Sequence, residues 1–281
     1  MKPCLVCIST TGFDPWYKSI QVCRTCGFHS CVHVSAPQDG YEEDYFCGGE
    51  YPDYLGQQDT LRASMRRHLQ QMSRHMSLKG QLFELGCAYG LFLDEAKKYF
   101  EVRGMDVGHG PTHYAKEKLG LPVVRGELLE SAEIKKVYDV ICLWDTIEHL
   151  QHPHLTLSRL LSMLKPGGRL FLTTGDLGSI MALWRGKNWR QIHPPTHLHY
   201  FSRRCMERLL LRLGYDEVQF ETASYCHSML GILSTLSLRK GVLGGLATLI
   251  LKILPHRWLK NIRIWLNLGD IMFVTAIRRS V

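Results

Sequence analysis

QLFELGCAYGLFLDEAKKYFEVRGMD, residues 81–106, has the pattern of a strand, a glycine turn, a helix and a second strand. The first five residues are mostly apolar, the chain breaks at Gly86, and apolar residues then recur at helical spacing. The second strand ends on Asp106, about twenty residues past the turn, where a carboxylate can accept hydrogen bonds from ribose hydroxyls. We therefore predict an α/β protein with a doubly wound sheet that binds a nucleoside.

The glycines of this turn indicate which nucleoside. Gly86 and Gly90 are spaced GxxxG, so the G-x-G-x-x-G pyrophosphate motif is absent and a dinucleotide is disfavoured. ELGCAYG instead resembles the first motif of the class I S-adenosylmethionine-dependent methyltransferases, with Ala88 where a middle glycine is common. The resemblance implies that Glu84, Gly86 and Gly90 shape the pocket for the methionine end, while Asp106 holds the ribose. An ordinary strand-to-helix turn is the alternative for each glycine.

A second group of motifs follows in the expected order. DVICLWDTIEHL, residues 139–150, and LKPGGRLFLTT, residues 164–174, resemble later motifs of the same family, above all the branch with the ubiquinone-pathway O-methyltransferases. The resemblance implies a seven-stranded, mainly parallel, Rossmann-like sheet. Its fourth strand would end with Trp144 and Asp145 at the switch point, where ligands bind. Glu127, after the third strand, would border the adenine, or would be a solvated loop carboxylate.

Three side chains are the candidate catalytic residues. Glu148 and His149 lie one turn past the fourth strand, and a histidine beside a glutamate in a ligand crevice can act as a general base near pH 7. Alternatively, both brace the helix that begins near His152. HPPTHLHYFS, residues 193–202, resembles the HL-x-x-FS element of the same branch, in which His197 would face the acceptor. Its three histidines are also a possible metal site, although Pro-Pro differs from the helical spacing of catalytic zinc ligands.

Two C-x2-C pairs at the N-terminus match the spacing of a zinc ribbon, and the predicted structural zinc ligands are Cys4, Cys7, Cys23 and Cys26. Four thiolates can bind zinc tetrahedrally, and the metal supplies folding energy to a segment too small for a core. A redox role is less favoured because no thioredoxin-like pattern surrounds the pairs. We predict a ribbon over residues 1–35, a linker or lid over 36–56 and a methyltransferase domain over 57–281.

Residues 57–76 have the spacing of an amphipathic helix, with a basic outer face made of Arg62, Arg66, Arg67 and Arg74. The family resemblance implies that this helix covers the cofactor. The sixth and seventh strands are expected at residues 217–222 and 271–278, as an antiparallel pair. Between them lies a helical insert, residues 227–268, with six basic residues and no acidic one. Its uncharged runs are too short to span a bilayer. The insert therefore predicts helices that lie on an anionic membrane surface or cap an apolar pocket.

Composition and the N-terminal residues indicate where in the cell the protein is expected. The chain has 281 residues, of which 45% are hydrophobic and 21% charged, as in ordinary globular proteins. The N-terminal residues MKPCLVCIST lack the pattern of a secretory signal, which indicates a cytoplasmic protein, free or attached peripherally to the inner membrane face. Ten cysteines in a reducing compartment favour metal binding over disulfides.

These features predict an enzyme that transfers a methyl group from S-adenosylmethionine to a hydroxyl of a glycan, a lipid-linked molecule or a quinol-like small molecule. One alternative is an RNA nucleobase methyltransferase with a zinc ribbon, and another is a binding module without turnover. WDTIEH differs from the Pro-Pro-Tyr/Trp type used on amino groups. The basic residues near the C-terminus are interleaved with aliphatic ones rather than with aromatic residues for base stacking. Nucleic acid is therefore disfavoured, though not excluded, as a partner.

Overall fold

A seven-stranded sheet forms the centre of the computed structural model, which describes residues 3–31, 54–131, 137–238 and 241–279. Five strands run parallel, and β13 is antiparallel to its neighbours β8 and β10. This arrangement confirms the predicted doubly wound, mainly parallel sheet. In spatial order the strands are β10 (Tyr215–Thr222), β13 (Ile271–Arg278), β8 (Leu164–Gly175), β7 (Tyr138–Trp144), β4 (Gln81–Leu85), β5 (Glu101–Asp106) and β6 (Val123–Arg125).

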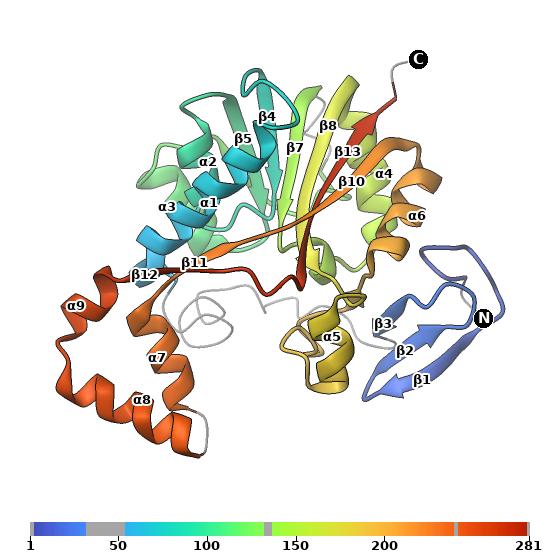
Figure 1. Ribbon diagram of the computed structural model, residues 1–281. Helices are drawn as coiled ribbons and strands as arrows, with labels where there is room; N and C mark the ends of the chain where they lie inside the picture. Colours follow the sequence, from blue (N-terminus) through green and yellow to red (C-terminus); the bar gives the residue numbers. More distant parts are fainter. Residues whose placement is uncertain (1–2, 32–53, 132–136, 239–240, 280–281) are drawn as a thin grey trace.

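Helices cover both faces of the sheet (Figure 1). On one face lie α1 (Gln58–Met72), α2 (Leu91–Ala96) and α3 (His109–Glu117), and on the other lie α4 (Pro153–Met163) and α6 (Arg203–Leu213). The ends of α6 follow the sequence signals, since the Ser202 side chain accepts a hydrogen bond from the backbone N–H of Cys205 and Gly214 adopts a φ of 101°. Shorter elements are η2 (Leu55–Gln57), η3 (Ile147–His149), α5 (Ile180–Arg185) and η4 (Gly186–Asn188).

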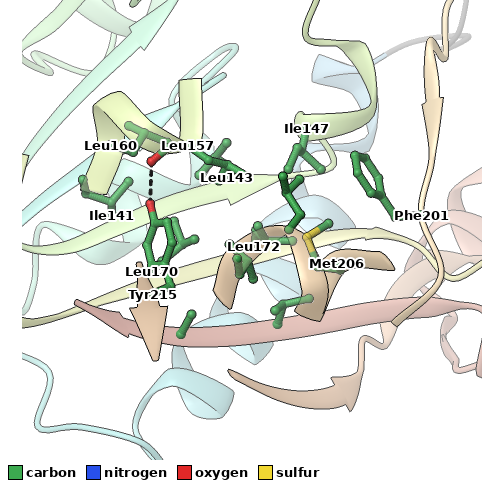
Figure 2. Packing of buried hydrophobic residues seen from close by; sticks show 14 of the residues in the cluster. Ile141, Leu143, Ile147, Leu157, Leu160, Leu170, Leu172, Phe201, Met206 and Tyr215 are labelled. Atoms are coloured by element: carbon green, nitrogen blue, oxygen red, sulfur yellow. Dashed lines mark hydrogen bonds between the residues drawn. The ribbon is translucent and has the colours of Figure 1, made fainter. Parts of the chain in front are cut away.

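The larger part of the core lies between the sheet and the α4 and α6 layer (Figure 2). Aliphatic side chains of β7 and β8 meet those of α4 and α6 there, and each fully buried side chain contributes about 1.5–3 kcal/mol. Tyr215 is buried in this layer, and its hydroxyl donates a hydrogen bond to the carbonyl of Leu157, 2.8 Å away. The core therefore fixes β10 and α4 against each other and holds the parallel strands rigid beneath the site.

The N-terminal segment forms a second sheet that is joined to the rest of the fold. Strands β1 (Phe13–Tyr17), β2 (Ile20–Cys23) and β3 (His29–Cys31) are antiparallel, and β3 also pairs with β9 (His199–Tyr200). Val6 and Phe28 belong to the same buried cluster as Phe201 and Met206. Residues 32–53 lie outside the described residues, so the bounds 1–35, 36–56 and 57–281 stay predictions.

The insert between β10 and β13 consists of helices in its middle and a β-strand at each end. It contains α7 (Met229–Ser237), α8 (Val242–Ile253) and α9 (His256–Asn261), which extend away from the main sheet (Figure 1). The prediction of helices over residues 227–268 was incomplete, because β11 (Tyr225–Ser228) pairs with β12 (Arg263–Leu266) as an antiparallel ribbon. No helix in the described part of the chain has the length and apolarity needed to cross a membrane.

The predicted basic outer face of α1 is wrong at Arg62. Its guanidinium contacts the Asp94 carboxylate of α2 at 2.6 Å, and its side chain is only 18% exposed. Arg66 likewise contacts Glu95 at 2.9 Å. Both arginines therefore connect α1 to α2, and Arg62 is largely buried in doing so whereas Arg66 stays about half exposed.

Candidate cofactor and acceptor site

A cavity of about 1490 Å³ opens at the carboxyl ends of β4, β5, β6 and β7. β5 lies on one side of β4 and β7 lies on the other, so the cavity is at the switch point of the sheet, where ligands bind in doubly wound folds. From there it continues past α1 and β11 to the side of α7. One continuous space therefore connects the glycine turn with the insert.

The turn after β4 leaves room at one end of this cavity. Gly86 has a φ of 77°, and a Cβ at this position would lie 2.4 Å from the side-chain oxygen of Thr146. Glu84 lines the cavity beside it, and one of its carboxylate oxygens is buried without a hydrogen-bond partner among the described residues. Burial, and then the charge of Asp106, raise the pKa of Glu84 well above its usual value. A buried carboxyl group with an unused acceptor fits the ammonium group of S-adenosylmethionine.

Gly90 has a different position from the one predicted. It adopts a φ of 73° at the start of α2, where a Cβ would lie 2.6 Å from Leu121 and 3.1 Å from the Cβ of Ala115. It is not among the residues that line the cavity in the described part of the chain. The absence of a side chain at Gly90 therefore allows the start of α2 to pack closely against Ala115 and Leu121. Gly90 belongs to the turn beside the cavity.

Asp106 lies at the end of β5, and its orientation is fixed by the backbone. One carboxylate oxygen accepts from the N–H of Ala88 at 2.8 Å and the other from the N–H of Gly108 at 2.9 Å. Burial raises the pKa of Asp106, although these backbone hydrogen bonds act in the opposite direction. Each oxygen retains acceptor capacity for a ribose hydroxyl. Glu127 follows β6 on the cavity wall with an exposed side chain.

Trp144 lies at the end of β7 and packs between the sheet and α1. Its ring stacks on His68 with centroids 4.7 Å apart and on Phe273 at 5.7 Å. His68, on α1, is buried, and burial lowers its pKa to about 4. Trp144 therefore forms a rigid part of the cavity floor. Sequence analysis missed His68, because a lone histidine on an apolar helix face carries no distinguishing signal.

Asp145 connects the cavity to the insert. It has a φ of 45°, and its carboxylate accepts hydrogen bonds from the hydroxyls of Thr173, at 2.9 Å, and Tyr225, at 2.7 Å. Burial raises the pKa of Asp145, and the two hydroxyls oppose that effect. Tyr225 belongs to β11, so the first strand of the insert reaches the switch point. No sequence pattern indicated this contact, which joins residues 80 positions apart.

The three predicted catalytic residues come together in the structure, although they belong to two distant segments. Glu148 is buried, and its carboxylate accepts from the Thr174 hydroxyl at 3.0 Å. Burial, followed by the charge of Asp145, raises the pKa of Glu148 to about 8. One atom each from Glu148, His149 and His197 lies within 4.8 Å of the others. All three residues line the cavity.

Both histidines of this group are held by backbone carbonyls. His149 Nδ1 lies 2.8 Å from the Thr196 carbonyl oxygen, and His197 Nδ1 lies 3.0 Å from that of Gln191. A carbonyl oxygen only accepts, so Nδ1 carries the proton in each ring and the lone pair is on Nε2. Burial lowers the pKa of His149 to about 4, and lowers that of His197 well below its usual value. Both rings are therefore neutral at pH 7.

The other two histidines of the 193–202 segment have different surroundings. The ring of His193 lies 3.8 Å from that of His197, whereas His199 stacks on Phe28 of the N-terminal sheet at 5.7 Å. The cluster that the structure forms thus combines His197 with Glu148 and His149, and it does not include His199.

The four cysteines predicted as zinc ligands also converge. The sulfur atoms of Cys4 and Cys26 are 3.7 Å apart, as are those of Cys7 and Cys23, and all four lie within 4.8 Å of one another. Zinc–sulfur bonds of about 2.3 Å in a tetrahedron separate the sulfur atoms by about 3.8 Å. The donor set and its spacing therefore fit zinc.

Comparison with known proteins identifies the family. A family model described as a methyltransferase domain matches residues 58–219, which is more than half of the chain. The chain belongs to this family. This match confirms the predicted family, the class I S-adenosylmethionine-dependent methyltransferases.

This methyltransferase is similar to two curated proteins that are named ubiquinone biosynthesis O-methyltransferase. That of Stutzerimonas stutzeri is 28% identical over 112 residues, which cover 37% of this chain and 48% of that protein. That of Marinobacter nauticus is 31% identical over 116 residues, covering 38% and 49%. The methyltransferase thus matches about half of the length of these relatives.

Solved structures show the same fold. A methyltransferase from Thermotoga maritima, described as a possible histamine N-methyltransferase, has a TM-score of 0.55 and 16% identity, with 84% of this chain and 98% of that chain covered. An S-adenosylmethionine-dependent methyltransferase from Archaeoglobus fulgidus has a TM-score of 0.52 and 18% identity, with 84% and 97% covered.

Proposed function

We propose that this methyltransferase transfers the methyl group of S-adenosylmethionine to a hydroxyl oxygen of an acceptor with a large apolar part, such as a lipid-linked or quinol-like molecule. The observation that carries the proposal is the continuous cavity, which runs from Gly86 and Asp106 past Glu148, His149 and His197 to α7. Its volume exceeds the range of about 300–1,000 Å³ that is usual for one small ligand. It therefore has room for a cofactor and an acceptor together.

The cofactor occupies the end at the glycine turn. Glu84 and Gly86 hold the methionine part, Asp106 holds the ribose, and Glu127 borders the base. Trp144 and Asp145 form the floor between cofactor and acceptor. S-adenosylmethionine supplies a methyl group activated by its sulfonium. Methyl transfer would form a bond between the acceptor oxygen and the methyl carbon while the carbon–sulfur bond breaks with its electron pair on sulfur, and the hydroxyl proton would pass to the lone pair on Nε2 of His149 or His197. Glu148, His149 and His197 assist the removal of that proton.

An apolar acceptor is supported by the far end of the cavity. Side chains of α7 line it there, among them Leu230, Ile232 and Leu236. The neighbouring α8 exposes Val242, Leu243, Leu246 and Ile253, and Lys252 and Lys260 are exposed nearby. Apolar helices with basic residues at their edges bind anionic membrane surfaces. The printed names of the relatives, ubiquinone biosynthesis O-methyltransferases, support an oxygen as the methyl acceptor.

The N-terminal sheet has a structural role in this proposal. One zinc ion bound by Cys4, Cys7, Cys23 and Cys26 stabilises the turns that carry the two cysteine pairs.

The test is a transfer assay with methyl-labelled S-adenosylmethionine and the full chain. Polyisoprenoid-linked sugars, quinol precursors and RNA are supplied as separate acceptors. We expect label on a hydroxyl oxygen of an apolar acceptor, lost in Asp106→Ala and retained in Glu117→Ala, which alters an exposed carboxylate of α3. Label on RNA bases alone would refute the proposal.

A further inference from the structure

The insert end of the cavity, where α7 lines it, carries positive charge that no acidic side chain offsets. The lysine and arginine side chains that line the cavity are Arg190, Lys260 and Arg263. Arg190 pairs with Asp270, whose carboxylate lies 3.0 Å from the guanidinium. Among the residues that the structure describes, no acidic side chain forms an ion pair with Lys260 or Arg263. Two cations therefore remain available to a ligand in the cavity.

We propose that Lys260 and Arg263 bind a phosphate group of the methyl acceptor at the insert end of the cavity. The inference rests on the proposed function, because it specifies the chemistry of the same acceptor. It narrows the acceptor to an apolar molecule that carries a phosphate monoester or diester in addition to the hydroxyl that is methylated.

The acidic side chains that line the cavity belong to other elements. None comes from the insert, because residues 225–268 contain no aspartate or glutamate. One belongs to α1, and the others belong to the main sheet or to the segments next to its strands: Asp59, Glu84, Asp106, Glu127, Asp145, Glu148 and Asp270. Charges of one sign along a cavity wall attract a ligand group of the opposite sign. An anionic group is therefore bound more favourably at the insert than at the switch point.

The backbone fixes the position of the two cations. Arg263 begins β12 opposite Ser228 of β11, and the N–H of Met229 donates a hydrogen bond to the carbonyl of Ile262 at 2.9 Å. Lys260 is in the last turn of α9, just before β12. Both cations are therefore held near the start of α7, where the helices of the insert leave the ribbon (Figure 1).

The phosphate site is separate from the reacting hydroxyl. Tyr225 donates a hydrogen bond to Asp145 at the switch point, and Ser228 lies farther along the same strand, at its other end. With a rise of about 3.4 Å per residue, Ser228 and Tyr225 are about 10 Å apart along β11. We therefore expect the hydroxyl and the phosphate to belong to different parts of the acceptor.

A phosphate suits these two cations better than a single-charged group does. A phosphate monoester has a charge of about −1.5 to −2 near pH 7 and presents three acceptor oxygens. The planar guanidinium of an arginine can bind two oxygens at once, and a lysine ammonium adds a compact charge. Leu230 and Leu236 of α7 line the cavity as well, so an apolar chain attached to the phosphate has a surface on which to pack.

Geranyl phosphate tests the site without methyl transfer, because it has an apolar chain and a phosphate but no alcohol hydroxyl. Its dissociation constant for the full chain is measured by calorimetry below the concentration at which it forms micelles. Lys260→Ala and Arg263→Ala should each raise this constant about fivefold, the scale of an ion pair that stays partly open to water, and the double variant roughly twentyfold. Unchanged binding in the double variant would overturn the inference.

Arg257→Ala is the matched control. It removes an exposed charge from α9, and Arg257 is not among the described residues that line the cavity. This variant should bind geranyl phosphate as the unmodified chain does. If it weakens binding as much as Lys260→Ala, the effect comes from the overall charge of the insert, and the proposed site is wrong.

Three further probes distinguish the sources of a phosphate. Geraniol should bind more weakly than geranyl phosphate and equally to all variants, and inorganic phosphate should also bind more weakly. If inorganic phosphate binds as tightly as geranyl phosphate, the site takes a free anion and the apolar acceptor is refuted. Phosphatidylglycerol vesicles present headgroup phosphate. If the double variant lowers partition to these vesicles but not geranyl phosphate binding, the two cations contact a membrane and the inference fails.

The two proposals can fail separately. Binding of geranyl phosphate that depends on Lys260 and Arg263, without methyl transfer to any hydroxyl, would refute the proposed function and leave the phosphate site in place. Transfer to a hydroxyl of an acceptor without phosphate, at the same rate in the double variant as in the unmodified chain, would refute the phosphate site alone.

Discussion

The backbone N–H of Cys31 donates a hydrogen bond to the carbonyl oxygen of Leu198, 2.8 Å away. This bond continues the pairing of His29 with Tyr200, so the N-terminal sheet holds the residue that follows His197. The guanidinium of Arg212, on α6, adds a hydrogen bond to the carbonyl of Val6 at 3.0 Å. The cysteine-bearing segment is thus a support for one wall of the cavity, rather than a detached module.

Loss of zinc from the four-cysteine site should therefore increase the mobility of the segment that begins at His197. We expect Cys26→Ser to lower the zinc content by about one ion per chain and to raise amide hydrogen exchange over residues 197–201 by roughly tenfold, equivalent to about 1.4 kcal/mol of local stability. Elemental analysis and exchange mass spectrometry measure the two effects. Cys226→Ser, which changes a buried cysteine outside the ribbon, is the control. Unchanged exchange in this segment would show that zinc does not support the wall.

Asp106→Ala should weaken S-adenosylmethionine binding by about 1.5 to 3 kcal/mol, the range for a lost hydrogen bond to a charged group. The dissociation constant then rises roughly tenfold to a hundredfold in calorimetry. Because Asp106 also holds the N–H groups of Ala88 and Gly108, thermal unfolding must be compared with that of the unmodified chain. Glu117→Ala should bind the cofactor normally. An unchanged dissociation constant for Asp106→Ala would remove this carboxylate from the ribose site.

His68 should make folding sensitive to acid. Burial lowers its pKa to about 4 in the folded chain, below the value of about 6.5 in the unfolded chain. The unfolded state therefore binds the proton first, and the contribution of neutral His68 to stability is present above pH 6.5 and is lost as the pH falls towards 4. His68→Phe keeps a ring against Trp144 and removes this titration. Between pH 7 and pH 5 the unmodified chain should lose about 2 kcal/mol more than the variant.

Denaturant unfolding at both pH values measures this difference. His113→Phe, at an exposed position, should follow the unmodified chain. Equal pH dependence of the unmodified chain and His68→Phe would mean that His68 is protonated in the folded state.

The insert should bind anionic vesicles. The triple variant Leu243→Ser, Leu246→Ser and Ile253→Ser removes exposed apolar side chains from α8, and its partition in co-sedimentation should fall severalfold. Lys252→Glu with Lys260→Glu should also weaken binding, by about 1 kcal/mol for each lost basic residue, and added salt should reduce binding of the unmodified chain.

A matched control changes exposed apolar residues elsewhere, namely Leu129→Ser, Val137→Ser and Leu155→Ser. If both triple variants bind alike, or if binding ignores lipid charge, the insert caps the acceptor pocket and does not contact a membrane.

Local patterns were sufficient for the sheet, and they indicated several residues that line the cavity. Alternation and helical spacing predicted the seven strands. The motifs placed Glu84 and Asp106 near the ends of their strands and Glu148 one turn past the fourth strand, and the carboxyl ends of parallel strands meet at one edge of the sheet. The pairing of β3 with β9 and the contact of Tyr225 with Asp145 join residues far apart in sequence, so no periodicity reports them. Arg62 looked like a solvent-facing residue because its partner, Asp94, lies on another helix.

The antiparallel pairing of β11 with β12 brings the two ends of the insert side by side, with Tyr225 opposite Leu266. Because the chain leaves the main sheet and returns to it at one place, the insert can change in length or sequence without altering the register of the seven strands. The three helices α7, α8 and α9 therefore form a unit that can be replaced as a whole while the strands beside the cavity stay in place. Because its two ends lie side by side, the insert is also a suitable place to graft another segment when the enzyme is to be redirected towards a chosen acceptor.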